Sequence, residues 1–385
     1  MEYDLVPSAE KQAFLAHIID DPADDLRRLV FADWLEEHGQ GQRAAYIRAR
    51  CALDGKTPEF GGYADAVAQL WDCEYVPAGL ELPTGFSFDP NTRVCRKNWG
   101  DKYDAMEGGL PSLVTLDMER LDVSEATRLL NVRMAALIKM MPMRGIKLGS
   151  YSWANAIALF ATTFASKVTR LEICFVTGDD EACPAILALA SSPMSRTLAY
   201  LDLVLGVPSV ATGDALAAAP FEALRRFDDS HPCDTPEVYR RLMSAPWFNR
   251  LESLAVPILP GAFGPVTMHW LHTLAVEPSE LGSFEPFVRN AELPALRRLL
   301  VSVIDMRGEP ARRLTELRCG DLVELWLSVV WLRSADLKVI LAAPWARRLE
   351  VLTIEISGPN VALHKTIDKS PCAKTLRVRR VGSFN

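Results

Sequence analysis

A short apolar pattern that recurs along most of the chain constrains its fold more than any other feature. The pattern is L-x-x-L-x-[LVI], and it occurs in seven clear and three weaker copies between residues 143 and 378. Neighbouring copies have their central residues 20 to 30 positions apart. These central residues are Ile146, Leu171, Leu201, Phe227, Leu254, Leu274, Leu299, Leu325, Leu352 and Leu376.

A pattern with this period is typical of leucine-rich repeats. Each copy predicts a strand whose apolar side chains point to one side. One repeat cannot bury that side alone, so successive copies are expected to stack into a solenoid with a continuous core. The copies lack a regular asparagine after the second leucine pair, and we therefore expect an irregular solenoid.

The segments between the predicted strands are compatible with helices. The clearest helical patterns cover residues 153–165, 180–191, 236–245 and 334–343. Several segments close at a small residue followed by proline, as in Ala343-Pro344. Proline disfavours helical structure in the residue before it, so it ends the helix and starts the return to the next strand. Several of the 25 prolines thus mark repeat boundaries.

The first fifty residues predict three helices. One begins near Ser8, the second covers residues 24–38 and the third covers residues 43–53. Gly39 stands where a glycine that ends a helix is expected. The second helix is expected to face the core with a wide apolar stripe, formed by Leu26, Leu29, Val30, Ala32, Trp34 and Leu35.

The string DDPADDLRRLVFADWLEEHGQGQRAAYIRAR is the most specific in the chain. It resembles the repeat-companion domain found at the N-termini of large planctomycete families of repeat proteins. The matching residues are Asp21, Pro22, Arg28, Leu29, Val30, Phe31, Ala32, Asp33, Trp34, Leu35, Glu36, Glu37, Gly39, Tyr46, Ile47 and Arg48. The resemblance covers about 40 residues, departs from the family pattern at residues 40–43, and implies that leucine-rich repeats follow. It implies no known catalytic reaction.

These patterns divide the chain into three parts. Residues 1–54 are the helical repeat-companion domain, residues 55–142 a connecting and N-terminal capping region, and residues 143–385 the leucine-rich-repeat solenoid. In the connecting region we expect a strand over 108–116 and a helix over 124–140. The predicted fold class is α/β, with a small helical N-terminal domain followed by an irregular leucine-rich-repeat solenoid.

Composition and charge exclude several classes of protein. With 49% hydrophobic and 24% charged residues, the chain is neither disordered nor collagen-like. No apolar run is long enough to span a membrane and no signal peptide is visible, so we expect a cytoplasmic protein. The eight cysteines include no C-x-x-C pair, and reduced thiols are expected. Residues 1–60 carry a net charge of −5 and residues 361–385 a net charge of +5.

The residues that flank each central leucine are expected on the concave face of the solenoid, opposite the core. Along this face the middle positions change from acidic through apolar to basic, in the order Glu172, Asp202, Asp228, Ala255, Ala275, Leu300, Trp326, Thr353 and Arg377. Exposed tryptophan and arginine often dominate binding energy, so we predict a protein or peptide partner on this face. The candidate binding residues are Tyr200, Asp202, Arg298, Leu300, Trp326 and Arg377. In the alternative, Trp326 is covered by a neighbouring strand or a cap.

Catalysis in the N-terminal region is a second hypothesis. An enzyme or enzyme subunit would use an unfamiliar site, such as Asp33, Glu37 and His38 together with residues of the connecting region. The sequence favours structural roles for these side chains, in which Asp33 or Glu37 pairs with Arg28 or Arg48. A metal site would normally draw ligands from a second element.

Nucleic-acid binding is a third hypothesis, through the basic end that holds Arg377, Arg379 and Arg380. The overall charge of −7 and the lack of aromatic residues near that strand favour a solvated end cap instead. His269 and His272 lack further metal ligands nearby in the sequence. No phosphate-binding, nucleophile or metal motif is recognised. The sequence therefore favours a noncatalytic scaffold without a metal or cofactor.

Overall fold

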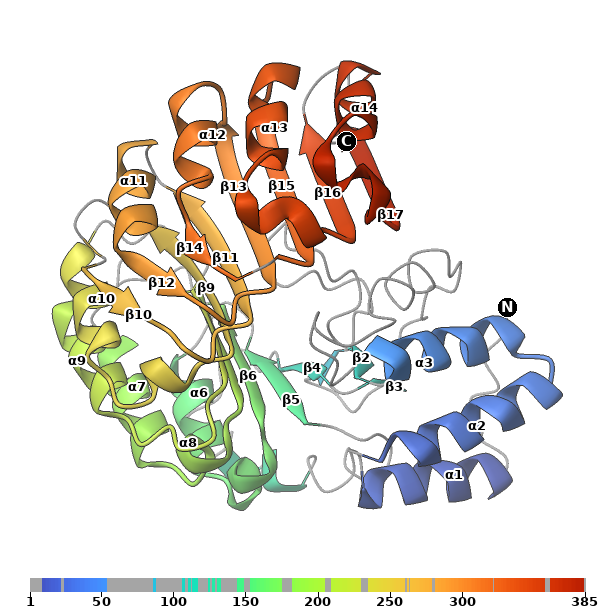
Figure 1. Cartoon of the computed structure of the whole chain (residues 1–385). Helices are drawn as coiled ribbons and strands as arrows, with labels where there is room; N and C mark the ends of the chain where they lie inside the picture. Colours follow the sequence, from blue (N-terminus) through green and yellow to red (C-terminus); the bar gives the residue numbers. More distant parts are fainter. Residues whose placement is uncertain are drawn as a thin grey trace.

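The computed structural model describes residues 9–21, 24–53, 86–87, 106–107, 110–111, 113–116, 124, 127–128, 130–132, 144–148, 153–174, 182–204, 209–229, 235–259, 262, 264–278, 281–320, 322–356 and 361–383. These residues form a mixed α/β fold with one large, mostly parallel sheet and helices (Figure 1). Within the described ranges, no helix is long and apolar enough to cross a membrane.

The large sheet has 12 strands in the order β1-β4-β5-β6-β7-β8-β9-β11-β13-β15-β16-β17. Strand β1 is antiparallel to β4, and the other neighbouring pairs are parallel. The strands are β1 (Phe86–Ser87), β4 (Leu113–Leu116), β5 (Gly145–Leu148), β6 (Arg170–Cys174), β7 (Tyr200–Val204), β8 (Arg226–Asp229), β9 (Ser253–Ile258), β11 (Thr273–Pro278), β13 (Arg298–Asp305), β15 (Glu324–Trp331), β16 (Val351–Ile356) and β17 (Val378–Ser383).

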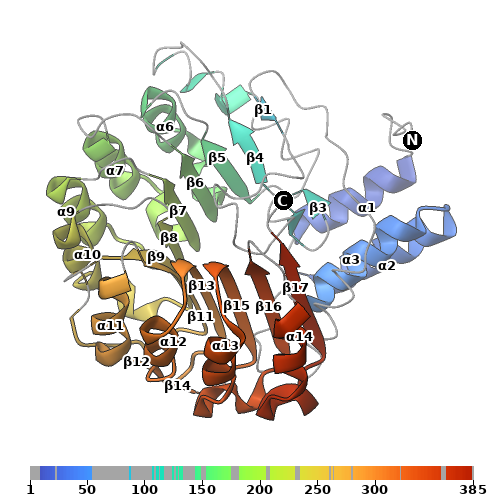
Figure 2. The ribbon, with the colours of Figure 1, turned by 90° about the horizontal axis from the view of Figure 1, so that it is seen from above.

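The sheet is curved, and the helices that alternate with its strands lie along its outer face (Figure 2). The opposite, inner face is termed the concave face. Parallel strands require such crossovers, because the chain must return to the same edge before each new strand. The connecting elements are α6 (Trp153–Phe160), η1 (Thr163–Lys167), α7 (Ala182–Ser191), α8 (Met194–Thr197), α9 (Val210–Ala218), α10 (Pro236–Met243), η3 (Phe248–Arg250), α11 (Leu281–Asn290), α12 (Glu309–Leu314), α13 (Ser334–Leu341), η4 (Pro344–Arg348), α14 (Val361–Asp368) and η5 (Pro371–Lys374).

Two smaller sheets accompany the large one. Three short parallel strands, β10 (Val266–Thr267), β12 (Ala291–Leu293) and β14 (Arg318–Cys319), pair with one another between the larger elements. Strands β2 (Met106–Glu107) and β3 (Leu110–Pro111) form an antiparallel pair before β4. The sequence pattern does not predict the three-stranded sheet, because strands of two or three residues are too short to show an alternating period.

At the start of successive strands the backbone makes the same forked hydrogen bond. The carbonyl oxygen of Thr169, for example, accepts from the N–H groups of Ala199 at 2.7 Å and Tyr200 at 3.0 Å. Nine carbonyls each accept in this way from two successive N–H groups at the start of the next strand. They belong to Arg144, Thr169, Ala199, Arg225, Glu252, His272, Arg297, Val323 and Glu350. This forked ladder fixes the register of each strand on the one before it.

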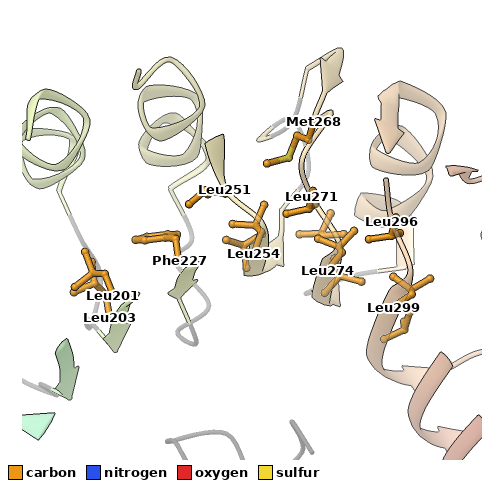
Figure 3. Packing of buried hydrophobic residues seen from close by; sticks show 14 of the residues in the cluster. Leu201, Leu203, Phe227, Leu251, Leu254, Met268, Leu271, Leu274, Leu296 and Leu299 are labelled. Carbon is orange, nitrogen blue, oxygen red and sulfur yellow. The ribbon is translucent and has the colours of Figure 1, made fainter. Parts of the chain in front are cut away.

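The register aligns the central residues of the apolar pattern in one column of the core. Leu171 pairs with Leu201, and Leu201 pairs with Phe227. The column consists of buried side chains, namely Ile146, Leu171, Leu201, Phe227, Leu254, Leu274, Leu299, Leu325 and Leu352. They belong to one apolar cluster that fills the space between the sheet and the outer helices (Figure 3). Burial of each leucine contributes about 1.5–3 kcal/mol, so this column is a principal source of stability.

The helices between the strands agree in part with the sequence pattern. The expected helices are found as α6, α7, α10 and α13, with the first segment divided into α6 and η1. Proline follows the helices as expected, since Pro344 begins η4 and Pro371 begins η5. The sequence pattern does not predict α9, α11, α12 or α14. Helix α11 contains Pro286 and α12 has 6 residues, and both features weaken a helical pattern.

The three expected N-terminal helices are α1 (Ala9–Asp20), α2 (Asp25–Glu37) and α3 (Gly41–Leu53). Asp24 caps α2, because its side chain accepts the N–H group of Leu26 at 2.9 Å. Gly39 follows α2 with a φ of +77°, a conformation that glycine adopts without strain. The three helices enclose a separate apolar cluster that contains Ile18, Phe31, Ala32, Leu35, Ala44, Ile47 and Cys51.

The apolar stripe predicted on α2 is too wide. Ala32 and Leu35 lie in the helical cluster, but Leu26 and Val30 are 67% and 45% exposed. Two packing partners cover only part of the circumference of α2, and these two aliphatic side chains lie on the uncovered part.

The last strand has a different register from the predicted one. Strand β17 pairs Arg379, and not Leu376, with the central residue Leu352 of β16. Leu376 is instead equivalent to Leu349, which stands three positions before the central residue, and Arg377 lies before the strand begins. Strand β17 is the last in the order of the described strands, and Arg379 at its central position is exposed.

The strand that we expected over residues 108–116 is found as two short strands, β3 and β4. Strand β4 joins the large sheet. The expected helix over 124–140 lies mostly outside the described residues, although the described residues of 124–132 are helical.

Gly320 offers a test of the packing around the three-stranded sheet. A Cβ atom at this position would lie 2.6 Å from the carbonyl oxygen of Pro294 and would also meet Arg297. Because backbone atoms cannot easily move aside, we expect Gly320→Ala to lower the free energy of unfolding by about 1–3 kcal/mol in urea titrations. Gly41→Ala is the control, since nothing lies within 4 Å of its added Cβ. Equal stability of Gly320→Ala and the wild type would contradict this packing.

Candidate functional site

The first half of the concave face holds a tyrosine between two arginines. The strand register places Arg170, Tyr200 and Arg226 side by side on β6, β7 and β8. The guanidinium carbons of Arg170 and Arg226 lie 4.5 Å and 4.4 Å from the centroid of the Tyr200 ring. Cation–π contacts of this kind contribute about 0.5–2 kcal/mol each. The tyrosine ring therefore fixes both guanidinium groups.

Three buried carboxylates lie in the next concave column. Glu172, Asp202 and Asp228 stand opposite one another on β6, β7 and β8. Arg170 donates to Oε1 of Glu172 at 2.6 Å, and Arg226 donates to Oδ2 of Asp228 at 3.0 Å. The cations of one column thus compensate carboxylates of the next, which lowers the cost of burying these charges.

The Tyr200 hydroxyl completes this polar cluster. It donates to Oδ2 of Asp228 at 3.0 Å. Burial raises the pKa of Tyr200 well above its ordinary value, and the negative charges of Asp228 and Asp202 oppose ionisation further, against the effect of Arg226. The phenol therefore stays protonated and remains a donor at neutral pH. The predicted binding residues Tyr200 and Asp202 lie on the expected face but are 7% and 1% exposed.

The second half of the concave face is apolar and equally buried. Trp326 and Leu300, predicted as an exposed hot spot, are 5% and 4% exposed. They form a cluster with Ala255 and Ala275, separate from the core on the other side of the sheet. The alternation of side chains is confirmed. Of the two readings of Trp326, the exposed hot spot is wrong, and the alternative, in which a neighbouring strand covers it, is confirmed by its contact with the cluster of Leu300. Side chains of one column converge on the inside of a curved sheet with strands about 4.8 Å apart, so large ones cover each other.

The predicted arginines also take part in contacts within the chain. Nε of Arg298 lies 3.0 Å from Oε2 of Glu324, which is the next residue along its column. Arg377 does not occupy the middle concave column, because the register of β17 gives that position to Arg380. Nε of Arg377 lies 3.8 Å from Oε2 of Glu350, and the side chain is 53% exposed.

Two exposed apolar side chains, Ile304 and Trp331, lie at the edge where β13 and β15 end, and strand alternation directs them to opposite faces of the sheet. These strands have 8 residues each and pair up to Asp305 and Trp331, whereas β11 pairs with β13 only up to Val301. Ile304 is 72% and Trp331 is 52% exposed. The guanidinium carbon of Arg307 lies 5.3 Å from the centroid of the Trp331 ring. Ile304, Arg307 and Trp331 are termed the carboxyl-edge ridge.

The candidate residues of the sequence analysis do not include this ridge. Its sequence signal is the alternation of apolar residues in VSVID and LSVVW, which runs beyond the end of the repeat pattern. Two strands that extend past their neighbours carry apolar side chains that the outer helices do not cover.

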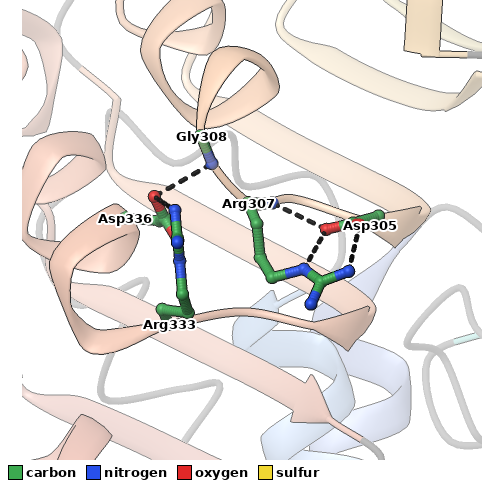
Figure 4. Close-up of polar contacts among 5 residues, drawn as sticks. All are labelled: Asp305, Arg307, Gly308, Arg333 and Asp336. Carbon is green, nitrogen blue, oxygen red and sulfur yellow. Dashed lines mark hydrogen bonds and ion pairs between the residues drawn. The ribbon is translucent and has the colours of Figure 1, made fainter.

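A carboxylate from the following crossover holds the backbone next to Arg307 (Figure 4). Oδ1 of Asp336, at the start of α13, accepts the N–H group of Gly308 at 3.0 Å. Gly308 has a φ of +71° and precedes α12, so this bond joins two consecutive crossovers. Arg333 donates to both oxygens of Asp336, from Nε at 2.6 Å and from Nη2 at 3.0 Å. Asp336 itself is 6% exposed.

Two carboxyl groups here are more acidic than usual. Hydrogen bonds from Arg333 lower the pKa of Asp336, and the Gly308 N–H group adds to this effect. Arg307 donates to Oδ1 of Asp305 at 2.9 Å and to Oδ2 at 2.6 Å, which lowers the pKa of Asp305. Both carboxylates are therefore ionised at neutral pH, and Arg307 is held in place beside Trp331.

The acidic residues of α2 serve the packing of the helices. Arg48 on α3 donates to Oδ1 of Asp33 at 2.7 Å and to Oε2 of Glu36 at 2.6 Å. His38 stacks on Trp34 with ring centroids 4.1 Å apart. The prediction that Asp33 pairs with Arg48 is confirmed.

The sequence analysis named Glu37 as a possible partner of Arg48. The structure instead pairs Arg48 with Glu36, which the sequence analysis missed. Arg28, the other proposed cation, pairs with Asp25. In the part of the chain that the structure describes, no group of three or more His, Cys, Asp or Glu residues is placed to hold a metal ion. Cys51, Cys183, Cys319 and Cys372 form no disulfide.

Comparison with known proteins identifies no family. No family model and no curated protein matches the chain. Among solved structures, the chain is similar to a crystal structure of a Bacteroides fragilis protein, with 10% sequence identity and a TM-score of 0.35. The match covers 67% of this chain and 81% of the other. A TM-score this low transfers neither fold nor function, so the proposals below rest on the residues of this chain.

Tyr200 provides a test of the polar cluster on the concave face. Tyr200→Phe keeps the ring between the arginines but removes the donor to Asp228, so we expect the free energy of unfolding to fall by about 1–2 kcal/mol. Tyr200→Leu also removes the cation–π contacts and should lower stability further. Urea titration at neutral pH measures both effects. The assignment fails if Tyr200→Phe is as stable as the wild type.

Asp336 provides a test that depends on pH. At neutral pH we expect Asp336→Asn to destabilise the protein by about 1–2 kcal/mol, because the charge-assisted bonds from Arg333 are weakened. The folded-state pKa is lowered, so the contribution of Asp336 is complete above its ordinary value of about 3.9 and is lost as the pH falls through the folded-state pKa. The stability difference should therefore shrink below about pH 4.

Urea midpoints of the wild type and Asp336→Asn over a pH series measure this difference. Asp214→Asn is the matched control, because Asp214 is 56% exposed and lies 3.6 Å from Arg241. An exposed pair of this kind contributes little at any pH. A difference between the wild type and Asp336→Asn that stays constant at low pH would exclude the proposed role of the carboxylate.

Proposed function

We propose that the chain is a leucine-rich-repeat solenoid that acts as a noncatalytic scaffold and binds a protein partner. The recurrence of the apolar pattern every 20 to 30 residues supports the repeat assignment. The equivalent forked hydrogen bonds at nine strand starts support it further. In such a solenoid the strands carry the binding surface and the helices cover the other side of the core.

The exposure of Trp331 beside Arg307, at the same edge of the sheet as the exposed Ile304, is the observation that carries the proposal of partner binding. Tryptophan and arginine are enriched among the residues that dominate interface energies. Arg307 is already fixed by Asp305, so little conformational entropy is lost when a partner covers it. The carboxyl-edge ridge therefore offers a rigid, partly apolar contact surface.

The ridge fits partner binding better than the middle of the concave face does. Leu300 and Trp326 are buried, and Tyr200 and Asp202 belong to an internally bonded cluster. By the alternation of β13, Ile304 has the same orientation as Leu300 and lies nearer the strand end. Trp331 pairs with Asp305 and therefore points to the opposite face of the sheet from Ile304. We therefore place the partner across the carboxyl edge of the sheet, where it contacts Ile304 on one face and Trp331 on the other.

The other two hypotheses gain no support from the geometry. The acidic residue Asp33 is hydrogen-bonded to Arg48, and His38 is stacked on Trp34. At the basic end, Arg379 donates to Oδ1 of Asp368 at 2.6 Å and to a backbone carbonyl. Both groups have structural partners of their own.

Quantitative capture from a native lysate tests the proposed function. The full chain serves as bait, and mass spectrometry compares the wild type with Trp331→Ala, Ile304→Ser and Trp270→Ala. Trp270 is 63% exposed and precedes β11, away from the ridge, so it controls for loss of an exposed tryptophan. We expect Trp331→Ala and Ile304→Ser to reduce capture of the same partner by about tenfold or more.

Circular dichroism of each bait establishes that the variants are folded. Retention of every wild-type partner by both ridge variants would exclude the ridge as the binding surface. Equal loss with Trp270→Ala would show that capture depends on exposed aromatic residues in general and would also contradict the proposal.

A further inference from the structure

Helix α2 of the N-terminal helices exposes a face that is apolar at one end and acidic at the other. Leu26, Val30, Asp33 and Glu37 follow one another at intervals of four, three and four residues, so they share one face. Leu26 is 67% and Val30 is 45% exposed. Glu37 is exposed and forms no ion pair with any described residue. The face extends over about 16 Å of helix, and these four residues are termed the head face.

The outer helices at the other end of the chain expose the complementary chemistry. Helix α13 exposes Val339, which is 43% exposed, beside Lys338. Helix α14 packs against α13 (Figure 2). It exposes Lys365, and the exposed Lys369 follows the end of the helix. In the described part of the chain, none of these three lysines forms an ion pair. These four residues are termed the tail face.

The nearby carboxylates do not neutralise the tail face. Asp336 on α13 is bonded to Arg333, and Asp368 on α14 is bonded to Arg379. The three lysines therefore leave a net positive charge on the exposed surface of α13 and α14, and α13 also exposes Val339. The head face has the opposite sign, because Asp33 and Glu36 share the single cation of Arg48 and Glu37 adds a further negative charge.

We propose that the head face of one copy of this chain binds the tail face of a second copy. The exposures of Leu26 and Val339 show that the two faces do not cover each other within one chain. Contact between copies would bury Leu26 and Val30 against Val339 and place Glu37 among the lysines. Apolar burial contributes about 1 kcal/mol or more for each side chain, and the opposite charges set the orientation.

This association joins two different surfaces and is head-to-tail. Such contacts produce rings if the rotation between copies closes and open chains if it does not. The proposal uses none of the ridge residues, so it is independent of the proposed function. It predicts that assembly weakens with salt, because exposed charges are screened over about 10 Å at 0.1 M ionic strength.

Two variants test the pairing of the faces. The head variant combines Leu26→Gln and Val30→Gln, and the tail variant combines Lys365→Glu and Lys369→Glu. All four residues are exposed, so folding should be preserved, and circular dichroism checks it. Sedimentation velocity at about 0.05 M and about 0.5 M salt measures the mass of the full chain. The control is Leu187→Gln, because Leu187 is 52% exposed on α7 and belongs to neither face.

The wild type and the control should exceed the chain mass of 42.7 kDa at low salt, in a concentration-dependent manner. Each face variant alone should remain at the chain mass. An equimolar mixture should reach twice the chain mass and no more, because the mixture pairs one intact head with one intact tail and leaves two inactive faces. Salt should weaken association of both the wild type and the mixture by about tenfold or more.

Three results would overturn the proposal. The wild type could remain at the chain mass at about 100 µM and low salt, where contacts of even modest affinity are populated. The mixed variants could fail to associate, which would show that the faces do not bind each other. The face variants could associate as strongly as the wild type, which would place the contact elsewhere.

Discussion

The forked hydrogen bond at the start of each strand is the constraint on which the rest of the structure depends. One carbonyl that accepts two successive N–H groups leaves no freedom of register, and a slip of one residue would turn every side chain to the opposite face. The arrangement recurs from Arg144 to Glu350. Differences in spacing between the central residues are therefore absorbed by the connections, while the columns of side chains stay aligned.

Fixed columns decide which interactions each face can make. On the core side most positions are apolar, and the buried carboxylate of Asp229 accepts a hydrogen bond from the hydroxyl of Tyr239 on α10 at 2.6 Å. On the concave side, curvature brings neighbouring side chains together, so charges such as Arg226 and Asp228 pair and Trp326 is covered. Strand alternation alone predicts that Asp228 and Trp326 are exposed. In the curved sheet they instead belong to a second buried layer on the concave side.

The sequence predicts the strands and the core column well, because both follow from a local period and the burial of leucine. Prediction from the sequence fails where two alternative registers, or two alternative ion-pair partners, fit the same local pattern. At the last strand Leu376 and Arg379 are each followed two residues later by valine, and only the backbone ladder selects Arg379. Likewise, Glu36 and Glu37 both lie near the end of α2, and the position of Arg48 on α3 decides which one forms an ion pair.

The last strand of the large sheet shows how an exposed position can be filled by a polar side chain that is bonded within the chain. At β17 the central position is an arginine, and its guanidinium donates to Oδ1 of Asp368 at 2.6 Å and to the carbonyl oxygen of Ala373 at 2.9 Å. Polar side chains that pair with each other could also have occupied four other exposed positions. Those positions instead hold apolar side chains, namely Leu26, Val30, Ile304 and Trp331. Exposed aliphatic and aromatic side chains in these places cost solubility without adding to the core, and their retention is accounted for if a protein surface covers them.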